Sequence, residues 1–186
     1  MISEKLLFEQ SKTTRIRDSR RLFESQEFVE RAQYDIFLSY SYDDKEFALI
    51  IYSMLEKDGF SVYIDLYDPN LSREKVDEET AKRIATILDK TKLVIYLHSF
   101  SSKKSKWCPW ELGYMSGKHN FACATLPIVN NKGEYDKQEY LMVYPYIDYL
   151  GVKDKDYSIF WIMKDSHTYT SLKEYIKFGS KLEKHI

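Results

Sequence analysis

The sequence predicts a doubly wound α/β fold with a mainly parallel central sheet. Short apolar runs recur from residue 34 onwards, and segments with helical spacing of apolar residues separate them. Strands and helices alternate in this way when right-handed helical crossovers join successive parallel strands. The length of 186 residues, with 44% hydrophobic and 31% charged residues, is typical of one soluble globular domain with its own core.

The apolar runs are the expected strands. Each is rich in β-branched and aromatic residues and nearly continuous in hydrophobicity, as expected for parallel strands covered on both faces. The expected sheet contains the runs at 34–39, 60–64, 93–97, 124–129 and 144–150. A later run at 157–163 is expected to be a last strand, and the amphipathic segment 171–178 a closing C-terminal helix.

Three helices are expected between the strands. The first has apolar residues at i, i+3, i+4, i+7 and i+8 between residues 47 and 55, and Gly59 stands where a helix C-cap is expected. The second runs through residues 81–88, after a long acidic stretch. The third is expected to begin at Pro109, a favoured first helical position, and to run toward His119.

Residues 1–33 precede this pattern and form a segment of their own. They are highly charged, with scattered apolar positions and no Gly or Pro, which predicts one or two helices. The expected role is a helical flap on the main domain, and the alternative is an arm for self-association or autoinhibition. The main domain then comprises residues 34–186, with a core at 34–150 and the closing strand and helix at 151–186.

Composition argues against several classes of function. Twenty-eight Lys and Arg against 29 Asp and Glu leave a net charge of −1, so no global field favours nucleic acid or an acidic membrane. Two isolated cysteines and the lack of a signal-peptide or membrane-spanning apolar stretch predict a reduced, cytoplasmic protein. The glycines build neither a dinucleotide fingerprint nor a P-loop, and His and Cys show no metal-ligand spacing, so no metal site is expected.

Ligands of doubly wound sheets bind beyond the carboxyl ends of the strands, near the point where the strand order reverses. Three segments are placed there, at residues 39–44, 65–73 and 99–111. The last leads into the third helix and carries Trp107 and Glu111, four residues apart. If the helix begins at Pro109, Glu111 is its third residue, where the helix N-terminus favours the ionised carboxylate.

A carboxylate beside a large aromatic ring can stabilise a developing sugar cation. Glycoside hydrolysis usually needs two carboxylates, but nicotinamide leaves NAD⁺ as a neutral ring, so a single carboxylate can suffice. The pair of Trp107 and Glu111 is therefore compatible with N-glycosidic cleavage. Both residues also have a purely structural explanation. Glutamate is common in the first turn of a helix, and the tryptophan can be a packing residue without a role in catalysis. The pair alone does not exclude this explanation.

Several linked segments resemble the Toll/interleukin-1 receptor (TIR) domain family. YDIFLSYS at 34–41, followed by DDKEF at 43–47, resembles the family's opening strand and first helix. GFSVYID at 59–65 resembles the family's second strand, and the acidic stretch after it resembles the BB loop. SKWCPWELGY at 105–114 resembles the third-helix motif. The likeness covers roughly residues 34–150 and is strongest to stand-alone bacterial TIR proteins with a helical N-terminal extension.

The resemblance implies a flavodoxin-like fold with a central five-stranded parallel sheet. For the enzymatic branch it implies cleavage of NAD⁺ into nicotinamide and ADP-ribose, or a cyclic or conjugated ADP-ribose, with NAD⁺ as substrate and no tightly bound cofactor. Glu111 falls on the family's catalytic glutamate, and Trp107 on the tryptophan of its W-x-x-x-E pattern. By the same resemblance, the substrate-binding positions are Phe37, Ser39, Tyr40, Ser41 and Asp65.

The setting implied by the resemblance is antiphage defence of the Thoeris type. There a TIR enzyme makes a diffusible nucleotide signal for a separate effector, and TIR domains associate on activation. Tyr40 departs from the family, since many relatives carry His or another polar residue at its position. Two alternatives stay open: a non-catalytic module for TIR–TIR assembly or interference with host signalling, and an enzyme similar to nucleoside deoxyribosyltransferases on a related sheet.

Overall fold

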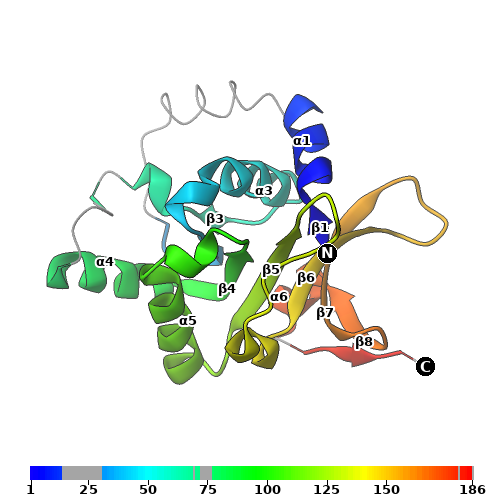
Figure 1. Ribbon diagram of the computed structural model, residues 1–186. Helices are drawn as coiled ribbons and strands as arrows, with labels where there is room; N and C mark the ends of the chain where they lie inside the picture. The colour runs from blue at the N-terminus through cyan, green and yellow to red at the C-terminus, as the bar shows by residue number, and fades with distance from the viewer. Residues whose placement is uncertain (14–30, 69, 72–76, 180, 186) are drawn as a thin grey trace.

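The computed structural model describes residues 1–13, 31–68, 70–71, 77–179 and 181–185. In this part of the chain a single sheet runs through the molecule, with helices packed against it (Figure 1). The strand order is β3-β2-β4-β5-β6-β7-β8-β9, and β1 pairs with β5 off this path. The order reverses between β2 and β4, as in a flavodoxin-like sheet.

The parallel half of the sheet confirms the predicted five strands, because β3, β2, β4, β5 and β6 all pair in parallel. Every residue of β5 is buried, as expected for a strand covered on both faces. The run predicted at 60–64 is shorter in the structure because only two of its residues keep register with β2. The bounds are β2 (Tyr34–Ser39), β3 (Val62–Tyr63), β4 (Thr91–His98), β5 (Cys123–Val129) and β6 (Tyr146–Gly151).

Antiparallel strands extend the sheet beyond β6. The predicted last strand is β7 (Ser158–Asp165), and β8 (Thr168–Ser171) and β9 (Glu183–Lys184) continue it. The sequence analysis predicted neither β8 nor β9, because both are short and lack an apolar run. The predicted closing helix is α6 (Leu172–Lys177), and the Ser171 side chain caps it by accepting the N–H of Glu174.

Two apolar clusters fill the space between the sheet and its helices. One joins α1 (Glu4–Thr13) and α3 (Lys45–Lys57) to the sheet, and the other joins α4 (Glu78–Leu88) and α5 (Trp107–Lys118) to it. Because side chains alternate along a strand, Ile36 and Leu38 of β2 belong to the first cluster and Phe37 to the second. The helices therefore cover both faces, which confirms the three-layer α/β fold.

Two helix ends bear on the sequence predictions. The end of α3 is as predicted, with Gly59 at φ 91°, a conformation that favours glycine. The predicted start of α5 at Pro109 is wrong, because the helix begins at Trp107. The first four N–H groups of a helix have no intrahelical acceptor, so proline is tolerated throughout the first turn, and Ser105 Oγ accepts the N–H of Cys108 at 3.2 Å.

The described part of the N-terminal segment is built into the domain. β1 (Ile2–Ser3) lies beside β5, with Ile2 opposite Ile128. α1 then packs on α3, as Figure 1 shows, and its Leu7 is completely buried. The remainder of the segment predicted as helical, residues 14–30, lies outside the described residues.

We expect Leu7→Ala to lower the free energy of unfolding by about 2–5 kcal/mol, because it leaves a cavity between α1 and α3. Urea unfolding of the full chain measures this difference. Glu9→Ala on the exposed side of the same helix is the matched control and should change stability by less than about 0.5 kcal/mol. Equal stabilities of the two variants would show that α1 does not contribute to the folded core.

Candidate active site

The candidate site lies where the strand order reverses. β2 and β4 are neighbours in the sheet, but the chain leaves β2 toward α3 on one face and leaves β4 toward α5 on the other. The loops at their carboxyl ends therefore separate, which is the usual position of ligand sites in such sheets. Ser39 is the last residue of β2, and Glu111 lies in α5 after β4.

A buried hydrogen bond joins these two residues. Ser39 Oγ donates to Glu111 Oε2 at 2.5 Å, although the residues are 72 positions apart in the sequence. Ser39 is 0% exposed and Glu111 is 1% exposed. The distance is within the range for a hydroxyl that donates to an ionised carboxylate. The structure therefore brings together Ser39 and Glu111, two of the residues predicted for the site.

Glu111 is the fifth residue of α5, because the helix begins at Trp107. The helix dipole acts mainly within the first turn, so it contributes less to an ionised Glu111 than the predicted start at Pro109 implied. The Ser39 hydroxyl supplies a direct contact in its place. This hydrogen bond links Glu111 to the carboxyl end of β2.

Aromatic side chains lie on the same side of the sheet as this hydrogen bond. Phe37 stacks on Tyr63 of β3, with ring centroids 5.1 Å apart, and both are 1% exposed. Trp107 packs against the same cluster, one helical turn before Glu111. Its Nε1 is buried and has no hydrogen-bond partner among the described residues, so this N–H is a donor that a ligand oxygen could satisfy.

The other predicted positions surround this group less closely. Tyr40 is completely buried in the cluster under α3, on the opposite side from Phe37. Ser41 is buried at the start of the loop after β2, and its carbonyl accepts the N–H of Asp44 at 2.8 Å. Asp65 is buried at the carboxyl end of β3. The structure therefore gathers Phe37, Ser39, Trp107 and Glu111 on one face and places the Tyr40 ring on the other.

A buried contact that the sequence analysis missed joins the loops after β2 and β4. Ser99 Oγ donates to Asp44 Oδ2 at 2.6 Å and accepts the N–H groups of Ser101 and Ser102. Asp44 is 3% exposed, and burial raises the pKa of its carboxyl above the ordinary value of 3.8. The contact fixes the start of the segment that leads into α5 and Glu111. Asp44 is part of the quoted TIR motif, but its partner depends on tertiary structure.

Asp44→Asn should stabilise the protein increasingly as the pH rises from about 4. The raised pKa means that ionising Asp44 costs the folded state more than the unfolded chain, so its contribution to stability falls as the pH rises through the raised value. Asparagine can still accept the Ser99 hydroxyl but does not ionise. Urea unfolding from pH 4 to 7 should show a growing difference from wild type, whereas the exposed Asp43→Asn should show none of this trend. A constant difference for Asp44→Asn would contradict the assignment.

Another buried carboxylate, that of Asp68, holds the segment that follows β3. Asp68 Oδ2 accepts from Tyr63 Oη at 2.8 Å and from Arg83 Nε at 3.0 Å, and Arg83 Nη2 lies 2.9 Å from the same oxygen. The backbone N–H of Asn70 donates to Asp68 Oδ1. This network ties the loop to α4 and to the Tyr63 ring that stacks on Phe37. Neither Tyr63 nor Arg83 was predicted, because the strand register and the loop path that pair them are not visible in the sequence.

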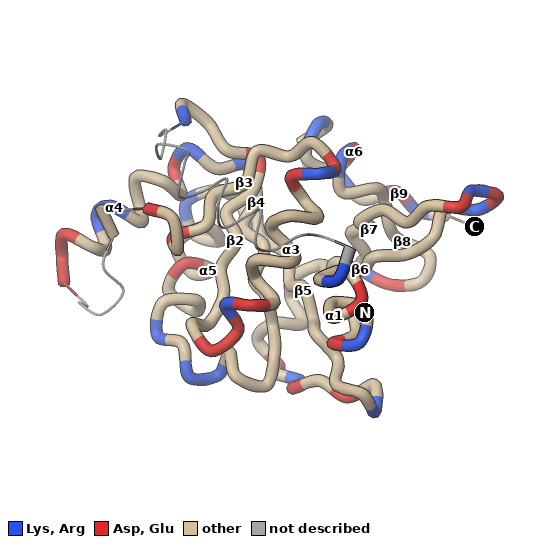
Figure 2. Tube along the Cα trace, turned by 90° about the horizontal axis from the view of Figure 1, so that it is seen from above, with Lys and Arg blue, Asp and Glu red and all other residues tan. Residues whose placement is uncertain are grey.

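Charged residues of both signs are dispersed along the described chain, as Figure 2 shows. Within residues 1–13, 31–68, 70–71, 77–179 and 181–185, no group of three or more His, Cys, Asp or Glu is placed to hold a metal ion. In the same residues, no helix combines the length and the apolar character that crossing a membrane requires.

A family model of the TIR domain matches residues 36–159 of this chain. The chain belongs to the TIR domain family. The match begins in β2 and ends in β7, so it contains the Ser39–Glu111 hydrogen bond and all the predicted site residues. The resemblance drawn from the sequence motifs is confirmed at this level.

Relatives of this TIR domain include two that are named as cyclic ADP-D-ribose synthases. The chain is 35% identical over 153 residues to a probable 3′ cyclic ADP-D-ribose synthase, ThsB′, of Bacillus cereus strain MSX-D12, covering 81% of this chain and 76% of the relative. It is 28% identical over 99 residues to a putative cyclic ADP-D-ribose synthase, TIR2, of Cytobacillus dafuensis. That second match covers 52% of this chain and 26% of the relative.

Solved structures similar to this TIR domain include two that contain TIR domains. One is the TIR domain of the Toll-related receptor TRR-2 of Hydra magnipapillata, with a TM-score of 0.43 and 14% identity, covering 59% of this chain and 78% of the other. Another is the TIR domains of the activated Roq1 resistosome, with a TM-score of 0.41 and 20% identity, covering 52% of this chain and 58% of the other.

Proposed function

We propose that this TIR domain cleaves the bond between nicotinamide and ribose in NAD⁺ and converts the remainder into a cyclic ADP-ribose. The observation that carries the proposal is the buried Glu111 carboxylate, held by the Ser39 hydroxyl at the point where the strand order reverses. The 35% identical relative is named as a probable 3′ cyclic ADP-D-ribose synthase, which supports the same reaction class for this chain.

Cleavage of NAD⁺ needs a negative charge beside the ribose that carries the nicotinamide. When the C1′–N bond breaks, the bonding electrons go to nicotinamide, which leaves neutral, and the ribose becomes an oxocarbenium-like cation. Glu111 holds the ribose hydroxyls and stabilises that cation, and its burial in a site of low polarity strengthens the interaction. A hydroxyl of the same ADP-ribosyl group then attacks C1′ and loses its proton, which closes the ring without water.

The neighbouring residues position the substrate in this proposal. Trp107 lies one turn before Glu111, and its unpartnered Nε1–H donates to an oxygen of NAD⁺. The Phe37 ring, stacked on Tyr63, forms an aromatic surface on the same face of the sheet as Glu111. Ser41 and Asp65 border the site from the ends of β2 and β3 without entering the chemistry, whereas the Tyr40 ring lies on the other face of the sheet and acts only through packing. NAD⁺ is the substrate, and the reaction uses no resident cofactor or metal.

The proposed setting is antiphage defence in the cytoplasm, where the cyclic product is a diffusible signal for a separate effector protein. The likeness to ThsB′ supports this setting. Association with other TIR domains is proposed as the active state, so the rate per chain should rise with protein concentration.

The test is incubation of the full chain with NAD⁺ at several protein concentrations, followed by chromatography and mass spectrometry. We expect nicotinamide together with an equal amount of a product one water lighter than ADP-ribose. If ADP-ribose is the only product besides nicotinamide, the enzyme hydrolyses NAD⁺ and does not cyclise it. If no nicotinamide forms at any protein concentration, even after exposure to lysate from phage-infected cells, the enzymatic proposal is overturned. The better account is then a non-catalytic module for TIR–TIR assembly.

A further inference from the structure

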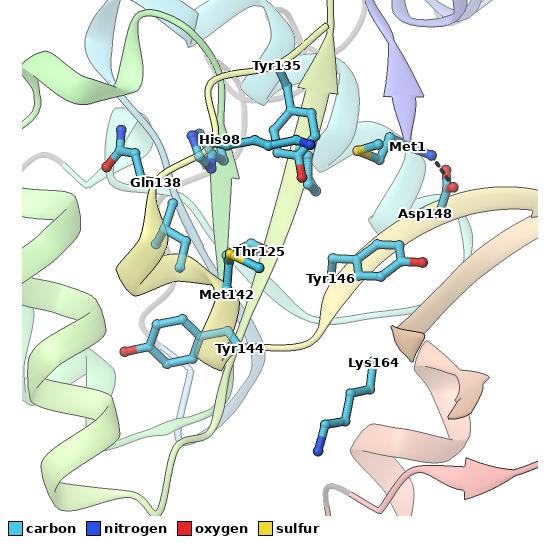
Figure 3. A pocket seen from close by; sticks show the side chains of 13 residues that line it. Met1, His98, Thr125, Tyr135, Gln138, Met142, Tyr144, Tyr146, Asp148 and Lys164 are labelled. Carbon is cyan, nitrogen blue, oxygen red and sulfur yellow. Dashed lines mark hydrogen bonds and ion pairs between the residues drawn. The ribbon is translucent and has the colours of Figure 1, made fainter. Parts of the chain in front are cut away.

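A cavity of about 440 Å³ opens between β5 and β6 and contains none of the predicted site residues (Figure 3). The two strands pair at a single register position, Thr125 opposite Tyr146, and β1 takes the edge of β5 further along. The chain that returns from β5 to β6 covers the opening, including η4 (Glu139–Val143). Its volume lies in the ordinary range of small-molecule sites.

The cavity is separate from the Glu111 site. Glu111 contacts β2 through Ser39, whereas the cover of the cavity packs on α5 through the 2.7 Å hydrogen bond between Ser116 Oγ and Tyr144 Oη. Leu141 of η4 belongs to the same apolar cluster as Leu112 of α5. The lining of the cavity and the Ser39–Glu111 pair have no residue in common.

Three tyrosine rings supply flat apolar walls to the cavity. Figure 3 shows Tyr135 at its upper side and Tyr144 and Tyr146 at its lower side. Tyr135 also meets the His98 ring edge-on, with centroids 6.1 Å apart. Rings arranged in this way can contact both faces of a planar heterocycle.

His98 supplies a polar group in the wall. It lies at the carboxyl end of β4 and is 2% exposed, and its Nε2 makes no hydrogen bond within the described residues. The nearest carboxylate, Asp136, is 4.0 Å away and is itself paired with Lys103. Burial lowers the pKa of His98 below 6.5, so its imidazole is neutral at neutral pH and can serve as a donor or an acceptor toward the edge of a base.

Two lysines line the cavity at separate places. Lys137 Nζ lies 6.0 Å from the centre of the Tyr135 ring, and Figure 3 shows Lys164 at the lower side, below Tyr146. Neither lysine forms an ion pair within the part of the chain that the structure describes. The Asp148 carboxylate, which also lines the cavity, is already paired with the amino group of Met1. The unpaired charge around the cavity is therefore cationic, which favours an anionic ligand.

We propose that this cavity binds a nucleoside phosphate, with the base among the tyrosine rings and against His98 and the phosphate at one of the two lysines, Lys137 or Lys164. A planar heterocycle without a phosphate would form no ion pair with the lysines, and a free phosphate would make no stacking contact with the tyrosine rings. A nucleoside phosphate makes both kinds of contact. The site is distinct from the substrate site and does not depend on the activity proposed for Glu111.

Calorimetric titration of the full chain with AMP, GMP, CMP and UMP tests this proposal, with adenosine and inorganic phosphate as the separate parts of the ligand. We expect at least one nucleotide to bind more tightly than adenosine or phosphate. Lys137→Ala combined with Lys164→Ala should weaken binding of that nucleotide by about tenfold or more, because the double variant removes the charged contact of the phosphate wherever it lies. Lys153→Ala with Lys155→Ala, an equal change of charge on an exposed loop, should leave its affinity unchanged.

Photocrosslinking locates the site. An azido derivative of the tightest nucleotide should label peptides from residues 135–146, in wild type and in Glu111→Gln alike. Failure of all four nucleotides to bind, equal affinity in the two double lysine variants, or labelling confined to peptides with Ser39, Trp107 and Glu111 would each overturn the proposal. Because NAD⁺ cleavage is not the readout, this test can fail while the proposed reaction stands.

Discussion

Glu111→Gln should lower kcat for nicotinamide release from NAD⁺ by about a thousandfold or more. The amide matches the carboxylate in size and can accept the Ser39 hydroxyl, but it brings no negative charge to the ribosyl cation. A thousandfold corresponds to about 4 kcal/mol of transition-state stabilisation, which one preorganised electrostatic contact in a buried site can supply. Initial rates over a range of NAD⁺ concentrations separate kcat from KM.

Stability separates loss of chemistry from loss of folding in this variant. Removing a buried charge should leave the urea midpoint of Glu111→Gln equal to that of wild type or higher. Glu79→Gln, at an exposed position of α4, carries the same change of charge and should keep full activity. A folded Glu111→Gln protein within tenfold of the wild-type rate would refute the role of this carboxylate.

Ser39→Ala should lower kcat by about 10- to 100-fold with little change in KM. The hydroxyl is expected to act through Glu111 by holding its Oε2, and a hydrogen bond to a charged group contributes about 1.5–3 kcal/mol. Loss of this contact leaves the charge in place but less well oriented. The effect should therefore be smaller than that of Glu111→Gln.

The same kinetic measurements test Ser39, with Ser166→Ala as the control. Ser166 is exposed in the turn between β7 and β8, and its loss should change neither constant. Ser39→Ala and Glu111→Gln should also be non-additive, because both act on one group. A change in KM alone would instead make Ser39 a substrate contact with no positioning effect on Glu111.

The sequence predicted the elements that carry the site because their signals are local. β2 and β4 are continuous apolar runs, and their order along the chain places Ser39 and the segment before Glu111 at one edge of the sheet. The family motifs then selected Trp107 and Glu111 among many charged and aromatic residues. The hydrogen bond between Ser39 and Glu111 was not itself predicted, because it depends on how α5 packs against β2.

The features that the sequence analysis missed depend on tertiary contacts. The two residues of β1 become a strand only because β5, more than a hundred positions later, offers them an open edge. The stack of Tyr63 on Phe37 requires the register between β3 and β2, and the Asp44–Ser99 hydrogen bond requires two loops to meet. The start of α5 was misplaced because proline is favoured at the first helical position but tolerated at the third.

A single-turnover experiment, with the protein in excess over NAD⁺, tests the central claim most directly, because product release does not limit the observed rate. Wild type should convert all the bound NAD⁺ into nicotinamide and a product one water lighter than ADP-ribose, and Glu111→Gln should leave the NAD⁺ intact over the same time. Equal rates of nicotinamide release from the two proteins would contradict the account of Glu111 as the group that stabilises the ribosyl cation.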